Sequence, residues 1–94
     1  MLDKSLYLFQ SDYIQTQHHL NQIPLIYTEA DSLVLLGEAV LCVEDARLAH
    51  LHNVYILAND AEMLINEIPS HISVLNYAEF ADLVLMYKRC ISFS

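Results

Sequence analysis

The 94-residue chain is poor in glycine: Gly37 stands alone, beside two prolines and no tryptophan. Phosphate-binding loops need several glycines, because the backbone must approach the phosphate closely. One glycine therefore excludes a P-loop and a dinucleotide-binding fingerprint. Linkers and disordered segments are also rich in turn-forming residues, so the composition predicts a single ordered domain over residues 1–94.

Positive charge is scarce as well. Twelve acidic residues face four cations, Lys4, Arg47, Lys88 and Arg89, which gives a formal net charge of −8. Binding to nucleic acid depends on clustered cations that neutralise phosphates. We therefore expect this chain not to bind nucleic acid directly, although it can belong to an RNA-processing assembly whose other subunits supply the cations.

Long hydrophobic runs are missing too. The longest apolar stretches, residues 33–36 and 39–43, are separated by Gly37-Glu38 and fall far short of the roughly 20 residues of a membrane-spanning helix. The first five residues lack the basic region and long apolar core of a signal peptide. We expect a cytoplasmic protein that does not associate with membranes.

The two cysteines, Cys42 and Cys90, form no C-x-x-C pair, and a cytosolic chain keeps such thiols reduced. Cys42 shares an apolar stripe with its neighbours and has Arg47 as its one nearby cation, so we interpret it as a packed, inert thiol. Cys90 follows two cations and is interpreted as a structural residue at the end of a helix. A sulfur-carrying role for either cysteine is the alternative, and no catalytic residue is assigned.

Five histidines raise the question of a metal site. On a helix the adjacent His18 and His19 would point about 100° apart, and His50 and His52 have no cysteine or acidic partner at a familiar ligand spacing. We therefore predict no metal site and no cofactor. No nucleophile-elbow motif supports a Ser-His-Asp triad either.

What the chain does contain is apolar material, at 55% of its residues, arranged in short runs that alternate with helical periods. The short runs predict buried strands. We expect these at Leu6–Phe9, Ser32–Leu36, Val54–Leu57 and His71–Leu75, with Ile91–Phe93 as a closing edge strand.

Four helical segments are expected between these strands. The first covers residues 12–22, with Asp12 and Gln15 as a capping pair. The second presents one apolar face, and a hairpin turning at Gly37-Glu38 is its alternative. The third and fourth open with capping boxes, at Asn59 with Glu62 and at Asn76 with Glu79. The apolar face of the second segment is Ala39, Cys42, Val43 and Ala46. That of the third is Ala61, Leu64, Ile65 and Ile68, and Pro69 ends this segment. That of the fourth is Tyr77, Phe80, Ala81 and Val84, with Lys88 and Arg89 in the last turn of the helix.

This alternation predicts a compact three-layer α/β domain: a mostly parallel sheet of four or five strands with helices on both faces. Ligands of such sheets collect beyond the carboxyl ends of the strands. The acidic residues at those ends would repel phosphate. The four ends are Gln10-Ser11-Asp12, Gly37-Glu38-Ala39, Ala58-Asn59-Asp60 and Asn76-Tyr77.

A domain this small buries only about 60–65% of its unfolded surface. An apolar content of 55% therefore predicts apolar surface that another chain covers. The chain is thus expected to be a subunit. The candidate docking residues are aromatic, with core packing as their alternative role: Tyr7, Phe9, Tyr13, Tyr77 and Phe80.

Three segments together resemble the DsrH/TusB family of small sulfur-relay proteins. Residues 33–40 are similar to the family's "LLLxDGV" junction, although Gly37-Glu38-Ala39 replaces the usual Asp-Gly. Residues 54–60 resemble its "VYAL…D" strand and helix start. The "ARG" that often follows this strand in the family is replaced by Glu62-Met63-Leu64. Residues 75–83 resemble its "VxYxxFVxL" segment. The resemblance spans nearly the whole chain and implies the DsrE/DsrH-like fold.

DsrH proteins of sulfur oxidisers carry a cysteine in the first helix, and residues 17–21 contain none. The resemblance therefore implies the TusB branch, a non-catalytic subunit in a heterohexamer with TusC-like and TusD-like subunits. That complex passes persulfide sulfur from a TusA-like to a TusE-like carrier for 2-thiolation of wobble uridine in tRNA. The alternatives are a DsrH-like persulfide carrier in sulfur transfer or sulfur oxidation, and a homo-oligomeric interaction module unrelated to sulfur.

Overall fold

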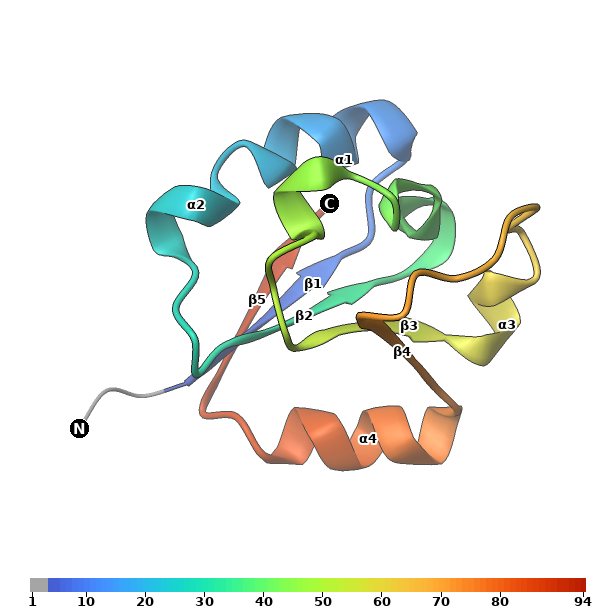
Figure 1. The fold of residues 1–94 in the computed structure, drawn as a ribbon. Helices are drawn as coiled ribbons and strands as arrows, with labels where there is room; N and C mark the ends of the chain where they lie inside the picture. The colour runs from blue at the N-terminus through green and yellow to red at the C-terminus, as the bar shows by residue number, and fades with distance from the viewer. Residues whose placement is uncertain (1–3) are drawn as a thin grey trace.

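A computed structural model describes residues 4–94. Residues 1–3, which belong to the N-terminal segment from which the localisation is predicted, lie outside the described residues. The chain forms a five-stranded, all-parallel sheet in the order β4-β3-β2-β1-β5 (Figure 1). This confirms the predicted α/β class, and adds the strand order. The strands are β1 (Ser5–Phe9), β2 (Ser32–Leu35), β3 (Val54–Leu57), β4 (Ile72–Leu75) and β5 (Arg89–Phe93).

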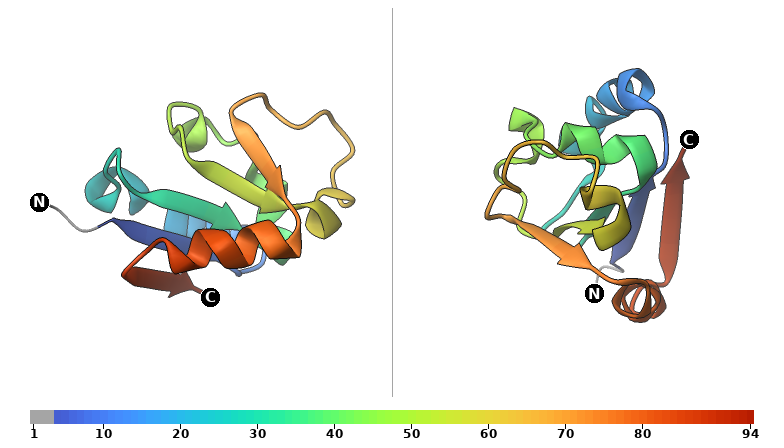
Figure 2. Two further views of the ribbon diagram at one scale, coloured as in Figure 1. Left: turned by 90° about the horizontal axis from the view of Figure 1, so that it is seen from below. Right: turned by 90° about the vertical axis from the view of Figure 1, so that its right-hand side faces the viewer.

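The helical segments are divided unequally between the two faces of the sheet. Most of them gather on one face, and α4 is the single described helix on the other (Figures 1 and 2). Within residues 4–94 no helix is long and apolar enough to cross a membrane. The segments are α1 (Tyr13–Leu20), α2 (Ile23–Ile26), the 3-10 helices η1 (Gly37–Cys42) and η2 (Ala46–Leu48), α3 (Ala58–Ala61) and α4 (Tyr77–Leu85).

Alternate residues of the strands β1 to β4 serve two separate cores, because successive side chains point to opposite faces of a sheet. On the face of α1 and η1, strand residues such as Phe9 and Leu35 pack with Leu20. On the opposite face Leu6 and Val34 pack beneath α4. All four residues of β2 are buried, which explains why this strand has a continuous apolar run in the sequence.

The third predicted helix is wrong beyond its first turn. α3 ends at Ala61, and Ile65 on the expected apolar stripe is 99% exposed. The Asn59 side chain donates to Tyr77 Oη instead of capping the helix, and Asp60 Oδ2 accepts from the Gly37 N–H. These contacts with distant residues override the local capping signal.

The second predicted helix forms as the two short 3-10 helices instead. Ala39, Cys42 and Val43 are buried as expected, whereas Ala46 is exposed. Asp45 interrupts the segment, because its side chain accepts from the Arg47 N–H and starts η2. The alternative hairpin is also wrong, since β2 pairs in parallel with both β1 and β3.

The capping box at Asn76 and Glu79 is confirmed, but the fourth helix differs in its face and its end. Its buried side centres on Leu83, while Tyr77 and Ala81 are exposed. The helix ends at Leu85, so Lys88 and Arg89 are not in its last turn and Cys90 lies on a strand. The physical reason is β5, which pairs with β1 over five residues.

A buried carboxylate, Asp31, connects the start of β1 with the turn before β2. It is 2% exposed; its Oδ1 accepts from the Ser5 N–H at 2.8 Å and its Oδ2 from the Thr28 N–H at 2.9 Å. Tyr27 donates its phenol proton to the Asp31 carbonyl at 2.8 Å, and burial, followed by the charge of Asp31, raises the pKa of Tyr27 to about 12. Both carboxylate oxygens are therefore occupied by backbone donors.

We expect Asp31→Asn to destabilise the protein by about 1–3 kcal/mol, because the amide presents N–H groups to a backbone donor and leaves it unsatisfied in the core. Urea unfolding measures the change. Asp82→Asn, at an exposed position of α4, is the matched control and stays within about 0.5 kcal/mol of the wild type. Equal stabilities of the two variants would contradict the role given to Asp31.

Candidate functional site

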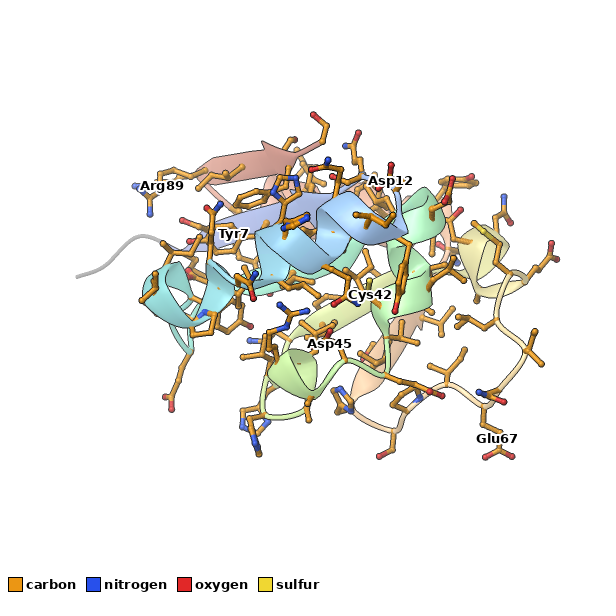
Figure 3. The ribbon with its side chains drawn as sticks, turned by 90° about the horizontal axis from the view of Figure 1, so that it is seen from above. Tyr7, Asp12, Cys42, Asp45, Glu67 and Arg89 are labelled. Atoms are coloured by element: carbon orange, nitrogen blue, oxygen red, sulfur yellow. The ribbon has the colours of Figure 1, made fainter. Side chains whose placement is uncertain are left out.

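Cys42 lies at the end of η1, beneath α1, and is 2% exposed. Figure 3 places Cys42 and Asp45 on the face of the molecule that α1 covers. The Gln17 side-chain amide of α1 points to the sulfur, with 3.7 Å between Nε2 and Sγ. The thiol is therefore enclosed between two helical segments.

Arg47 holds this region together, because its guanidinium donates to three residues at once. Nε and Nη2 reach the two carboxylate oxygens of Asp45 at 2.8 and 2.7 Å. Nη2 also reaches Gln17 Oε1 at 2.6 Å, and Nη1 reaches the Gln17 carbonyl at 3.0 Å and Asn21 Oδ1 at 2.6 Å. All five donors of the guanidinium are engaged. Arg47 thus connects α1 to η2 over the position of Cys42.

Burial raises the pKa of the Cys42 thiol, and the charge of Asp45 raises it further, against smaller lowering effects of Gln17 and Arg47. The Arg47 hydrogen bonds lower the pKa of Asp45, so that carboxylate stays charged. A thiolate is the reactive form of cysteine. Cys42 therefore remains a neutral thiol at pH 7 and is a poor nucleophile.

Cys90 has the opposite setting. It lies on edge strand β5 and is exposed. Its register partner on β1 is Leu6, whose side chain packs beneath α4. Cys90 therefore faces the α4 side of the sheet, far from the enclosure of Cys42 on the other face. The structure does not bring the two cysteines together.

At the carboxyl edge of the sheet, a carboxylate occupies the backbone donor of Gly37. Gly37 adopts a φ of +58°, and its N–H donates to Asp60 Oδ2 at 2.9 Å. The N–H of Gly37, the residue with a left-handed backbone conformation, is therefore already paired with the Asp60 carboxylate. A small cavity of about 50 Å³ lies nearby, where Asn59 Nδ2 donates to Tyr77 Oη at 3.1 Å. The Asp60 carboxylate beside Gly37 therefore disfavours a phosphate at this position.

The histidines are dispersed over the fold. His19 packs in an aromatic group, with its ring centroid 6.4 Å from that of Phe9 and 5.2 Å from that of Phe93. His50 and His52 line a shallow hollow beside Tyr27. Residues 4–94 contain no group of three or more side chains arranged to hold a metal ion.

The predicted docking aromatics fall into three groups by their exposure. Tyr7 and Phe9 are buried in the core, so their docking role is wrong, and Phe80 is half-buried on the side of α4 that packs against the sheet. Tyr13 and Tyr77 are exposed at the carboxyl edge. Because their side chains are exposed, Tyr13 and Tyr77 remain candidates for contact with a partner.

Two features escaped the sequence analysis. The contact of Gln17 with Cys42 joins residues 25 positions apart, and no local pattern signals it. The exposed apolar side of α4 had a visible signal, because seven of its nine residues are apolar and a helix buries only one side against a sheet.

Comparison with known proteins supports the fold and identifies the family. The crystal structure of the ychN protein from E. coli is similar, with a TM-score of 0.66, and the alignment covers 99% of this chain and 100% of that one. The two sequences are 10% identical, so this likeness concerns the fold. No curated protein sequence matches the chain. The model of the family described as "DsrH like protein" matches residues 14–90, and the chain therefore belongs to the DsrH-like family.

Proposed function

We propose that this chain is a non-catalytic structural subunit of a cytoplasmic sulfur-relay complex. In this proposal it assembles with TusC-like and TusD-like subunits into a heterohexamer. The complex passes persulfide sulfur from a TusA-like to a TusE-like carrier, towards 2-thiouridine at the wobble position of tRNA. Membership of the DsrH-like family supports a role related to sulfur relay.

The observation that carries the proposal is the state of Cys42. In persulfide transfer an acceptor thiolate attacks the outer sulfur of a donor persulfide, a new S–S bond forms, and the donor cysteine leaves as a thiolate. The acceptor must therefore be accessible and able to lose its proton. Cys42 is enclosed, and its pKa is raised. Cys42 is accordingly not the active thiol, and the proposal assigns that role to a partner subunit.

A second candidate function rests on Cys90. This thiol is exposed on β5 and meets the access requirement that Cys42 fails. In this alternative the chain is itself a persulfide carrier, as DsrH-like proteins of sulfur oxidation are. The two functions differ in one measurable respect, namely whether a sulfur atom ever resides on this chain.

We expect iodoacetamide at about pH 7 to modify Cys90 and to spare Cys42 in the folded protein, because alkylation needs an accessible thiolate. At about pH 9 Cys42 should still react more slowly than Cys90, because its sulfur is buried and burial raises the pKa of its thiol. Intact-mass spectrometry of the wild type, Cys42→Ser and Cys90→Ser assigns the adducts. Both thiols react in denaturant, which serves as the control. Modification of folded Cys42 as fast as that of Cys90 would contradict the interpretation.

The assembly itself can be tested by co-expression with TusC-like and TusD-like subunits. We expect one chromatographic peak with the mass of a heterohexamer by light scattering. When the complex is supplied with a sulfurtransferase, cysteine and a TusA-like carrier, the TusD-like subunit gains a sulfur atom and this chain does not. A complex that contains Cys42→Ser and Cys90→Ser together transfers sulfur like the wild type.

Two other results have different meanings. A sulfur adduct on this chain that disappears in Cys90→Ser would replace the proposal by the carrier alternative. A chain that stays free of both subunits would refute the structural role. Substitution of the TusD-like subunit's active cysteine is the control, because it must abolish transfer whatever this chain does.

A further inference from the structure

α4 is apolar on two sides. Phe80, Leu83 and Val84 pack against the sheet. A second set of apolar residues lies away from that core, and its members are neighbours because they are separated by three or four positions. We call this set the outer stripe of α4: Tyr77, Ala78, Ala81 and Leu85, all exposed.

The exposure of the outer stripe is unusual for a surface helix. Leu85 is 83% exposed and Tyr77 63%, and Met86, just after the helix, is 60% exposed. A surface helix normally carries polar residues opposite its buried side, and a helix that is apolar all round is a buried one. Among residues 4–94 no element covers the outer side of α4, which lies at the bottom of Figure 1 and is seen end-on in the right view of Figure 2.

This helix is also held in a fixed position before any partner arrives. The capping box satisfies its first turn, with 2.8 Å from the Glu79 N–H to Asn76 Oδ1 and 2.9 Å from the Asn76 N–H to Glu79 Oε1. Tyr77 at the start of the stripe accepts from Asn59. A docking surface that is ordered in advance loses less conformational entropy on binding.

The charges beside the outer stripe determine which partner fits. Asp82 follows Ala78 by four positions and precedes Leu85 by three, so its carboxylate borders the stripe. In a contact between two copies related by a two-fold axis, residues near the centre meet their own equivalents. Pairing centred on Ala81 would place Asp82 opposite the Asp82 of the other copy. Each copy would also bring a net charge of −8. A second copy is therefore a poor occupant.

We propose that the outer stripe of α4 docks a neighbouring subunit of the relay complex, through an apolar surface bordered by lysine or arginine side chains that face Asp82. The inference rests on the proposed function and names the docking surface within it. Apolar burial supplies the affinity, and the opposite charges select a different subunit over a second copy of this chain.

A competing surface exists around Ile65. It combines Leu41, Met63 and Ile65 beside a hollow that Glu44 and Glu67 also line. The segment from residue 62 to residue 71 is irregular, so this surface lacks the fixed geometry of a helix. It serves as a rival in the experiment.

The test titrates this chain into the co-purified TusC-like and TusD-like subunits by calorimetry. Leu85→Asp should weaken binding by at least about tenfold, the size of effect expected at a central contact. Leu25→Asp on α2 is the matched control, because Leu25 is 85% exposed, and its affinity should stay within about twofold of wild type. Asp82→Lys should also weaken binding, more strongly at low salt than at high salt. Thermal melts verify that each variant is folded.

The outcomes separate the inference from the proposed function. Wild-type affinity in both Leu85→Asp and Asp82→Lys overturns the inference and leaves the proposed function standing. Loss of binding in Ile65→Asp alone assigns docking to the rival surface and also overturns it. A homodimer of the isolated chain that Leu85→Asp dissociates identifies a second copy as the occupant, against the proposal. Absence of any wild-type complex refutes the proposed function and the inference together.

Discussion

The parallel pairing of β5 with β1 governs the arrangement of this molecule. β4 is the edge strand on one side of the sheet and β5 is the edge strand on the other, with β3, β2 and β1 between them. The connection from β4 to β5 must therefore pass beneath these three strands, and α4 is the helix that does so. A nine-residue helix covers the central strands of this face. Cys90 at the edge and the outer side of α4 remain exposed.

The two faces of the sheet consequently serve different purposes. The face with α1, η1 and η2 contains the larger core and the Arg47 contacts, and it encloses Cys42. These features give stability and keep a thiol protonated. The face with α4 has a smaller core and an exposed apolar helix, features suited to contact with another protein. This division is the basis of the structural role proposed for this member of the DsrH-like family.

Much of the fold was predictable because the local signals agreed with the tertiary environment. β3 occupies the predicted range, since a strand buried on both faces has an apolar run of its own length. The capping box at Asn76 formed as predicted, because the side chains of Asn76 and Glu79 each accept from the other's backbone N–H. At Asn59 the same signal failed, since Tyr77 and Gly37 bind the side chains of Asn59 and Asp60. Identical local patterns thus gave different structures in different surroundings.

The candidate site follows the same rule. Composition and spacing alone determined that this is an α/β domain without a phosphate-binding loop, since these properties depend on residue types and short periods. The strand order, the enclosure of Cys42 by Gln17 and Arg47, and the exposure of Cys90 were decided by the tertiary structure. They depend on contacts between residues far apart in the chain, and no local pattern specifies which distant residues meet.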